Sequence, residues 1–153
     1  MEATMLLCDS AEAVNGKLYI LGAGWSVTGP VPAPSALAIK IDVPWNDANR
    51  RFPADLELLT SDGVPVTVPD QLGQPQPVRF HFDFEVGRPP GVAPGSTLDA
   101  VLAVSVPPLP LMAGSRFVWR LTINGETRQH WQVAFATRGA ETRAGGPADI
   151  PPL

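Results

Sequence analysis

The side chains of this sequence that could do chemistry gather in one alternating stretch, residues 78–86. His81, Asp83 and Glu85 stand at every second position there, between phenylalanines. Alternate residues of a β-strand share one face and lie roughly 6.5 Å apart, so an imidazole and two carboxylates on that face could ligate a divalent metal. Arg79 stands on the same face. Because a solvated strand face of mixed charge is the commoner meaning of such a pattern, we keep a metal-dependent enzyme or metal-binding domain as the alternative function.

The candidates for nucleophilic catalysis are few. Cys8 is the only cysteine, and His81 and His130 are the only histidines. Cys8 lies in an apolar run without a nearby cation to lower its pKa, so we expect an inert, buried thiol. No serine stands in the Gly-x-Ser-x-Gly pattern of a hydrolase elbow. The sequence therefore predicts no catalytic residue.

Two glycines partly match a dinucleotide-binding motif. Gly22 and Gly24 end an apolar run, and Asp42 follows at the spacing of a dinucleotide-binding fingerprint. The segment that should begin a helix instead carries Pro30, Pro32 and other breakers, so no helix N-terminus can receive a pyrophosphate. We expect no cofactor. Asn46, Asp47 and Asn49 could suggest calcium, but they lack a bidentate glutamate at a defined spacing.

The elements that must position these side chains are strands. The chain has 153 residues, with 18 prolines and 14 glycines placed between short apolar runs. This rhythm is typical of an antiparallel β-sandwich with Pro/Gly-rich loops, here of eight or nine strands. We expect a single domain over residues 1–138 and a flexible tail over residues 139–153, where no pattern remains.

Two Asn-Gly turns anchor the strand assignment. Asn15-Gly16 should join residues 3–14 to residues 16–29 in a hairpin, and Asn124-Gly125 should join 117–123 to 131–135. Alternation predicts further strands at 36–43, 54–60 and 78–86. Pro65 makes 64–68 an edge strand, and the nearly all-apolar 98–106 should lie centrally. The residues expected in the core are Phe80, Phe82, Phe84, Trp119, Leu121, Trp131, Val133 and Phe135.

Composition limits the partners. The net charge of −4 argues against a nucleic-acid ligand, which would require a basic patch. No apolar run approaches the length that spans a bilayer, so we expect no integral membrane association. A lone cysteine, no recognisable secretory signal and a preference for arginine over lysine indicate a cytoplasmic bacterial protein.

A group of loop residues is hard to explain by packing alone. If successive strands are antiparallel, loops 44–53 and 107–115 meet at one end of the sandwich. An aromatic and cationic group would then stand beside an apolar one, as in protein-docking patches. We therefore predict a non-enzymatic protein-binding or assembly module, bound by a partner protein or a second copy. The predicted contact residues are Trp45, Arg50, Arg51, Leu109, Leu111 and Met112.

Several short motifs carry a family resemblance. They are LLCD at residues 6–9, GKLYILG at 16–22 with Trp25, VPW at 43–45 with NRR at 49–51, FEVGRPPG at 84–91, and WRL at 119–121 with NGE at 124–126. Over residues 1–138 the chain resembles an uncharacterised, mainly actinobacterial family of unknown function. The resemblance implies a compact β-sandwich, and it implies no known activity and no catalytic residue.

Overall fold

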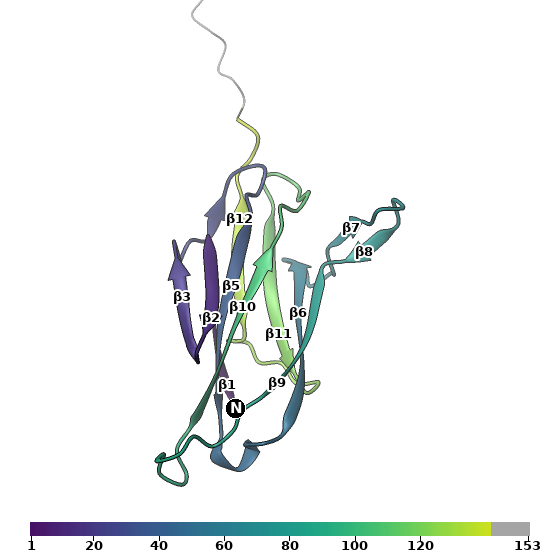
Figure 1. The fold of residues 1–153 in the computed structure, drawn as a ribbon. Helices are drawn as coiled ribbons and strands as arrows, with labels where there is room; N and C mark the ends of the chain where they lie inside the picture. The colour runs from purple at the N-terminus through teal and green to yellow at the C-terminus, as the bar shows by residue number, and fades with distance from the viewer. Residues whose placement is uncertain (142–153) are drawn as a thin grey trace, which may run out of the picture.

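The computed structural model describes residues 1–141, which form two packed, mainly antiparallel sheets (Figure 1). One sheet has the strand order β1-β5-β10, and the other has the order β4-β12-β11-β6-β9. The strands are β1 (Glu2–Cys8), β2 (Ser10–Val14), β3 (Lys17–Leu21), β4 (Val27–Thr28), β5 (Ser35–Val43), β6 (Arg51–Thr60), β7 (Thr67–Pro69), β8 (Pro75–Pro77), β9 (Arg79–Glu85), β10 (Leu98–Val106), β11 (Arg116–Ile123) and β12 (Gln132–Thr137). A single 3₁₀ turn, η1 (Trp45–Asp47), follows β5. The predicted all-β sandwich is confirmed.

The core lies between the two sheets. On β5, Leu37, Ile39 and Ile41 are all 0% exposed, and Leu56 and Leu58 on β6 face them with the same value. Their two-residue spacing sends each set to one side of its strand. Of the predicted core residues, Phe84, Trp119, Leu121, Trp131 and Phe135 are buried, whereas Phe80, Phe82 and Val133 are partly buried.

The first predicted hairpin is present, but its outgoing strand is shorter than expected. Asn15 and Gly16 have φ values of 50° and 72°, as a tight turn between antiparallel strands requires. The predicted strand 3–14 breaks at Asp9, whose backbone N–H donates to the Leu21 carbonyl at 3.0 Å. Residues before the break pair with β5, and residues after it pair with β3. The break lets the chain leave one sheet and fold back across it.

The β2–β3 hairpin covers part of the outer face of the three-stranded sheet. A second small core lies beneath the hairpin and contains Cys8, Ala11, Ala36 and Ala38. Three of these four side chains are single methyl groups, so the hairpin can approach the sheet closely. Leu18, Ile20 and Ala103 pack against the same cluster. The molecule therefore has a third layer on one side (Figure 1).

The position predicted for β10 is wrong. This strand is an edge of its sheet, and β5 is the central strand. The apolar outer side chains that suggested a central position are explained by the β2–β3 hairpin, since Ala103 packs beneath it. An apolar run shows that both faces of a strand are covered, but it does not reveal whether both edges are paired.

The strand predicted at 64–68 does not cross the sandwich. Only the short β7 forms there, and it pairs with β8 alone in a hairpin that projects from the body (Figure 1). Asp70 Oδ1 accepts backbone hydrogen bonds from Leu72 and Gln74 at 2.8 and 2.9 Å, which fixes the turn. The chain therefore enters β9 from the same end at which it left β6.

The described residues include twelve strands instead of eight or nine, because the first strand is divided and β4, β7 and β8 are very short. Most of the tail predicted at 139–153, residues 142–153, lies outside the described residues. Within residues 1–141, no helix is long and apolar enough to cross a membrane.

Candidate functional site

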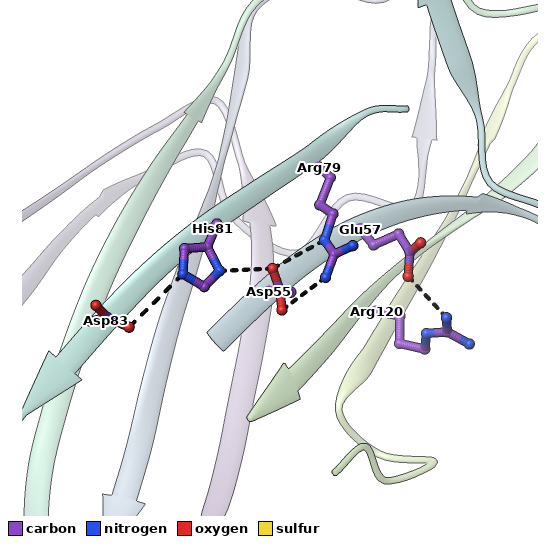
Figure 2. A network of polar contacts seen from close by, with 6 residues as sticks. All are labelled: Asp55, Glu57, Arg79, His81, Asp83 and Arg120. Atoms are coloured by element: carbon purple, nitrogen blue, oxygen red, sulfur yellow. Dashed lines mark hydrogen bonds and ion pairs between the residues drawn. The ribbon is translucent and has the colours of Figure 1, made fainter. Parts of the chain in front are cut away.

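The predicted chemical face lies on the outer surface of the five-stranded sheet. His81 and Asp83 project from β9, and Asp55 of the neighbouring strand β6 contacts His81 (Figure 2). Asp55 Oδ1 is 2.9 Å from His81 Nδ1, and His81 Nε2 is 3.9 Å from Asp83 Oδ1. The Arg79 guanidinium binds both Asp55 oxygens at 3.0 Å. The result is a row of alternating charges across two strands.

Asp55 is the centre of this row. The hydrogen bond from Arg79 lowers the pKa of the Asp55 carboxyl below its ordinary value, and His81 adds to the effect. The same pairing raises the pKa of Arg79. A second pair continues the row, since Arg120 of β11 donates to Glu57 of β6 at 2.9 Å (Figure 2). The contact with Arg79 therefore favours the ionised form of the Asp55 carboxyl.

The geometry does not gather the three predicted metal ligands. Glu85 lies beyond Asp83 and faces Arg51 across the strand pair. The Asp55 carboxylate, which is nearest to the His81 imidazole, is already bound by Arg79. In residues 1–141, no group of three His, Cys, Asp or Glu side chains is arranged to hold a metal ion. Sequence reasoning missed Asp55 because it comes from another strand, although its outward position in the alternating run 54–60 was visible.

The predicted partner patch is divided between the two ends of the sandwich. Val43 pairs with Leu98 at one end of β10, and Ser35 pairs with Val106 at the other. Trp45 follows the first end, and the loop containing Leu109, Leu111 and Met112 follows the second. A strand of nine residues separates them, on the order of 30 Å. The common end expected for loops 44–53 and 107–115 is therefore wrong.

The projecting β7–β8 hairpin explains this error. Counting residues 64–68 as a strand that crosses the sandwich adds one reversal to the chain path. Every later loop is then assigned to the wrong end relative to loop 44–53. The order of crossings depends on which strand pairs with which, and the local alternation of 64–68 carries no such information.

At the first end, Trp45 is partly buried and packs with charged neighbours. The Arg88 guanidinium lies 4.7 Å from the Trp45 ring centre, and Arg88 also donates to the Trp45 carbonyl at 2.9 Å. Arg50 pairs with Asp47 at 2.9 Å and lies over the Phe52 ring at 5.3 Å. These contacts anchor the loops that follow β5 and β9. Arg51 is exposed at the start of β6.

At the other end, Leu109 and Leu111 serve packing. Both are partly buried against the main core, and they line a small internal cavity together with Trp25 and Trp119. Met112 is 75% exposed. The Cys8 thiol is fully buried and donates to the Ala36 carbonyl at 3.4 Å. Burial raises the pKa of Cys8, so the thiolate needed for nucleophilic attack is disfavoured.

The sandwich is open on the side where β9 and β10 form the edges of their sheets. In the described chain, β9 pairs only with β6, and β10 pairs only with β5. Each edge strand therefore presents unpaired backbone N–H and C=O groups. A groove of about 630 Å³ lies between the end of β9 with the loop that follows it and the first half of β10, lined by Phe84, Arg88, Ala100 and Leu102 among other residues.

The inward side chains near this open side are incompletely covered. Phe80 is only partly buried, although its cross-strand neighbour Leu56 is 0% exposed. Leu102 is likewise partly buried beside Ile39, which is 0% exposed. The same holds for Phe82 and Val104. Apolar surface and unpaired backbone thus occur together along this side.

The opposite side is held shut by ion pairs. Glu2 at the start of β1 contacts Arg128 and His130, which lie between β11 and β12. The hydrogen bond with His130 is the main cause that lowers the pKa of Glu2. Arg128 also lies over Trp131 at 5.0 Å. The two sides of the sandwich are therefore unequal, because ion pairs bridge one of them and the other is bordered by the edge strands β9 and β10.

Fold and site together define an antiparallel β-sandwich with one open side and a charged outer face. The chain belongs to a family of unknown function (DUF6941), whose model matches residues 3–135. This confirms the family of unknown function expected from the short motifs. No curated protein and no solved structure matches the chain.

Proposed function

We propose that this domain is a non-enzymatic protein-binding and assembly module that joins another polypeptide by strand addition at its open side. The observation that carries the proposal is the unpaired edge of β9 beside inward phenylalanines that are only partly buried. An added strand would satisfy the backbone groups and cover the apolar side chains in one step. Neither the pairing of the backbone groups nor the burial of the apolar side chains requires catalytic residues.

The chemistry of the edge defines the partner segment. On β9, phenylalanines alternate with charged residues of both signs. A matching strand carries apolar side chains on the face toward the groove and charged side chains on the solvent face. Such a segment is extended and amphipathic with a period of two residues. Main-chain hydrogen bonds then supply affinity, and the alternate side chains supply specificity.

Edge strands left open in this way usually carry protective features. Here the outward charges of Arg79 and Asp83 restrict pairing to strands with a compatible charge pattern. The neighbouring β7–β8 hairpin carries prolines at its paired positions, for example Pro69 opposite Pro75, so it is a poor strand donor itself. This contrast supports β9 as the selective docking edge.

We place this module in the bacterial cytoplasm. The proposal rests on the single, fully buried Cys8, which forms no disulfide within the chain, and on the arginine-rich, lysine-poor composition. Fractionation of the native host, followed by immunoblotting of the soluble and envelope fractions, checks this location. Recovery in the envelope fraction would contradict it.

A site-specific cross-link tests the docking side. Benzoylphenylalanine replaces Phe82 on the open side, and in a matched control it replaces Tyr19, which is 58% exposed on the outward face of β3. We expect irradiation in the host cell to link position 82 to an extended segment of one polypeptide. Position 19 should give no such product. In the purified complex, amide exchange along β9 should slow, because its edge N–H groups become bonded.

Equal labelling from both positions, or unchanged exchange along β9 in the complex, would refute strand addition at this side. Circular dichroism of the two substituted proteins controls for loss of fold.

A further inference from the structure

On the exposed face of β9, the basic residues come before the acidic ones. Reading along the strand, Arg79 and His81 come first, and Asp83 and Glu85 follow. All four side chains are on the solvent face, and the residues between them are phenylalanines. One half of the strand is thus basic and the other half is acidic.

The charge pattern of β9 is self-complementary when a second copy of the strand runs in the opposite direction. When two copies of β9 run antiparallel about a centre at Phe82, the position numbers of facing residues add to a constant. Arg79 then faces Glu85 of the second copy, and His81 faces Asp83 of the second copy. Phe80 faces Phe84, and Phe82 faces its own copy. Every solvent-face contact joins a basic residue to an acidic one, and every inward contact joins two aromatic rings.

We propose that a second copy of this chain is the strand partner, bound through antiparallel β9–β9 pairing about a two-fold axis at Phe82. This inference rests on the proposed function, because it names the occupant of the same open edge. The two five-stranded sheets become one continuous sheet across the axis. The interface is closed and isologous, since the same edge serves both copies.

Other registers of the same strand lack this match. A centre at Phe80 places Arg79 opposite His81, and a centre at Phe84 places Asp83 opposite Glu85, so like charges meet. A centre at Asp83 places that carboxylate against its own copy. Directly facing like charges destabilise a strand pair. A centre at His81 pairs Arg79 with Asp83, but it sets two imidazoles against each other and leaves Glu85 opposite Pro77. The register at Phe82 therefore gives the most complete match of basic to acidic residues.

The other edge strand on the open side, β10, does not offer an equivalent pairing. On β10 the residues that point away from the main core are Asp99, Val101, Ala103 and Ser105, and the β2–β3 hairpin covers Ala103. An antiparallel self-pair centred at Leu102 would set Asp99 opposite Ser105, without an ion pair. In addition, Asp99 is already bound to Lys40 at 3.1 Å. The two edges thus differ in the charge pattern that selects a partner.

The existing contacts of β9 leave capacity for the new ones. Arg79 uses Nε and one terminal nitrogen on Asp55, so its second terminal nitrogen stays available to a carboxylate. Glu85 is exposed and forms no ion pair in the described residues. Asp83 has only the 3.9 Å contact with His81, and its side chain is 46% exposed. Both acidic partners are therefore free to face a second copy.

Charge reversal gives a decisive test by analytical ultracentrifugation. Glu85→Lys turns both symmetric Arg79–Glu85 contacts repulsive, so we expect the dimer to weaken about tenfold or more. Arg79→Glu should weaken it as well. An equimolar mixture of the two variants should restore the dimer. The Glu85→Lys chain is basic at positions 79 and 85, and the Arg79→Glu chain is acidic at both, so opposite charges face each other in the mixed dimer. Glu126→Lys, the same charge change at an exposed turn, should leave the dimer unchanged.

Arg79→Glu also removes a contact with Asp55, so a second measurement avoids this substitution. Residue 82 faces its own copy across the axis, at a separation compatible with a disulfide. Oxidised glutathione should therefore link two Phe82→Cys chains, with release of reduced glutathione. Phe80→Cys, which faces position 84 instead, should remain unlinked.

The outcomes separate this inference from the proposed function. A wild-type chain that stays monomeric at high concentration, or equal linking of the two cysteine variants, overturns the β9–β9 dimer. If position 82 still cross-links to a different polypeptide in the host, strand addition stands with another occupant. If neither dimer nor cross-link forms, both proposals fail.

Discussion

Asp55 of β6 lies directly opposite His81 of β9, with 2.9 Å between Asp55 Oδ1 and His81 Nδ1. Arg79 binds the same carboxylate, so one acidic side chain joins two basic side chains of the edge strand β9. This contact ties the edge strand β9 to the inner strand β6. It links the stability of the edge to the ionisation of Asp55.

Asp55→Asn should therefore destabilise the domain in a pH-dependent way. The folded pKa of Asp55 is lowered from the ordinary 3.8, so its stabilisation is present above that value and disappears as pH falls through the folded pKa. We expect a loss of about 1 kcal/mol at neutral pH. Urea unfolding at pH 7 and near pH 2 checks this.

Asp83→Asn is the matched control for that experiment, because Asp83 makes only a 3.9 Å contact with His81. Its effect at neutral pH should be clearly smaller. An Asp55→Asn penalty that persists unchanged at the acidic pH would show that packing, and not charge, is lost.

Trp119→Ala should remove a large part of the stability. Trp119 is 1% exposed between the sheets, and its ring lies 6.0 Å from that of Phe80. Truncating a buried tryptophan costs about 3–5 kcal/mol. Guanidinium unfolding monitored by circular dichroism measures the loss. Trp45→Ala, at a partly buried position, should cost much less, and equal losses would contradict the assigned core.

Gly22→Ala should destabilise the open end of the β2–β3 hairpin, where Gly22 follows β3 and Asp9 precedes β2. Gly22 has φ +61°, and an added Cβ would collide with the Asp9 carboxylate. A left-handed conformation costs a non-glycine residue roughly 1–2 kcal/mol, and the collision adds to this cost. Gly16→Ala provides the control, since Gly16 has φ +72° and no atom near the added Cβ.

A double variant separates the two causes at Gly22. Combining Gly22→Ala with Asp9→Ala removes the carboxylate and should recover the part of the loss that comes from the collision. If the double variant is simply the sum of the two single effects, the contact with Asp9 plays no role.

Cys8 should react with iodoacetamide only after unfolding. The thiol is 0% exposed, and burial raises its pKa. Mass spectrometry of native and denatured samples gives the labelled fractions. Rapid labelling of the native protein would place the thiol at the surface, against the structure.

The sequence by itself determined the local structure of this protein. The alternation of Leu37, Ile39 and Ile41 places these side chains on one face because side chains of a strand alternate. Asn124 and Gly125 have the positive φ values, 50° and 79°, that their types favour in tight turns. Such features depend on neighbouring residues alone, and they were sufficient to predict the all-β sandwich.

Tertiary structure decided which strands are neighbours and which edges remain open. The apolar run of β10 suggested a central strand, but the β2–β3 hairpin covers its outer face while one edge stays unpaired. The alternation of 64–68 suggested a crossing that the β7–β8 hairpin does not make, and this moved Trp45 away from Leu109. Asp55 meets His81 only because β6 and β9 pair. Pairing joins residues far apart in the chain, and local periodicity reports the face of a strand without naming its neighbour.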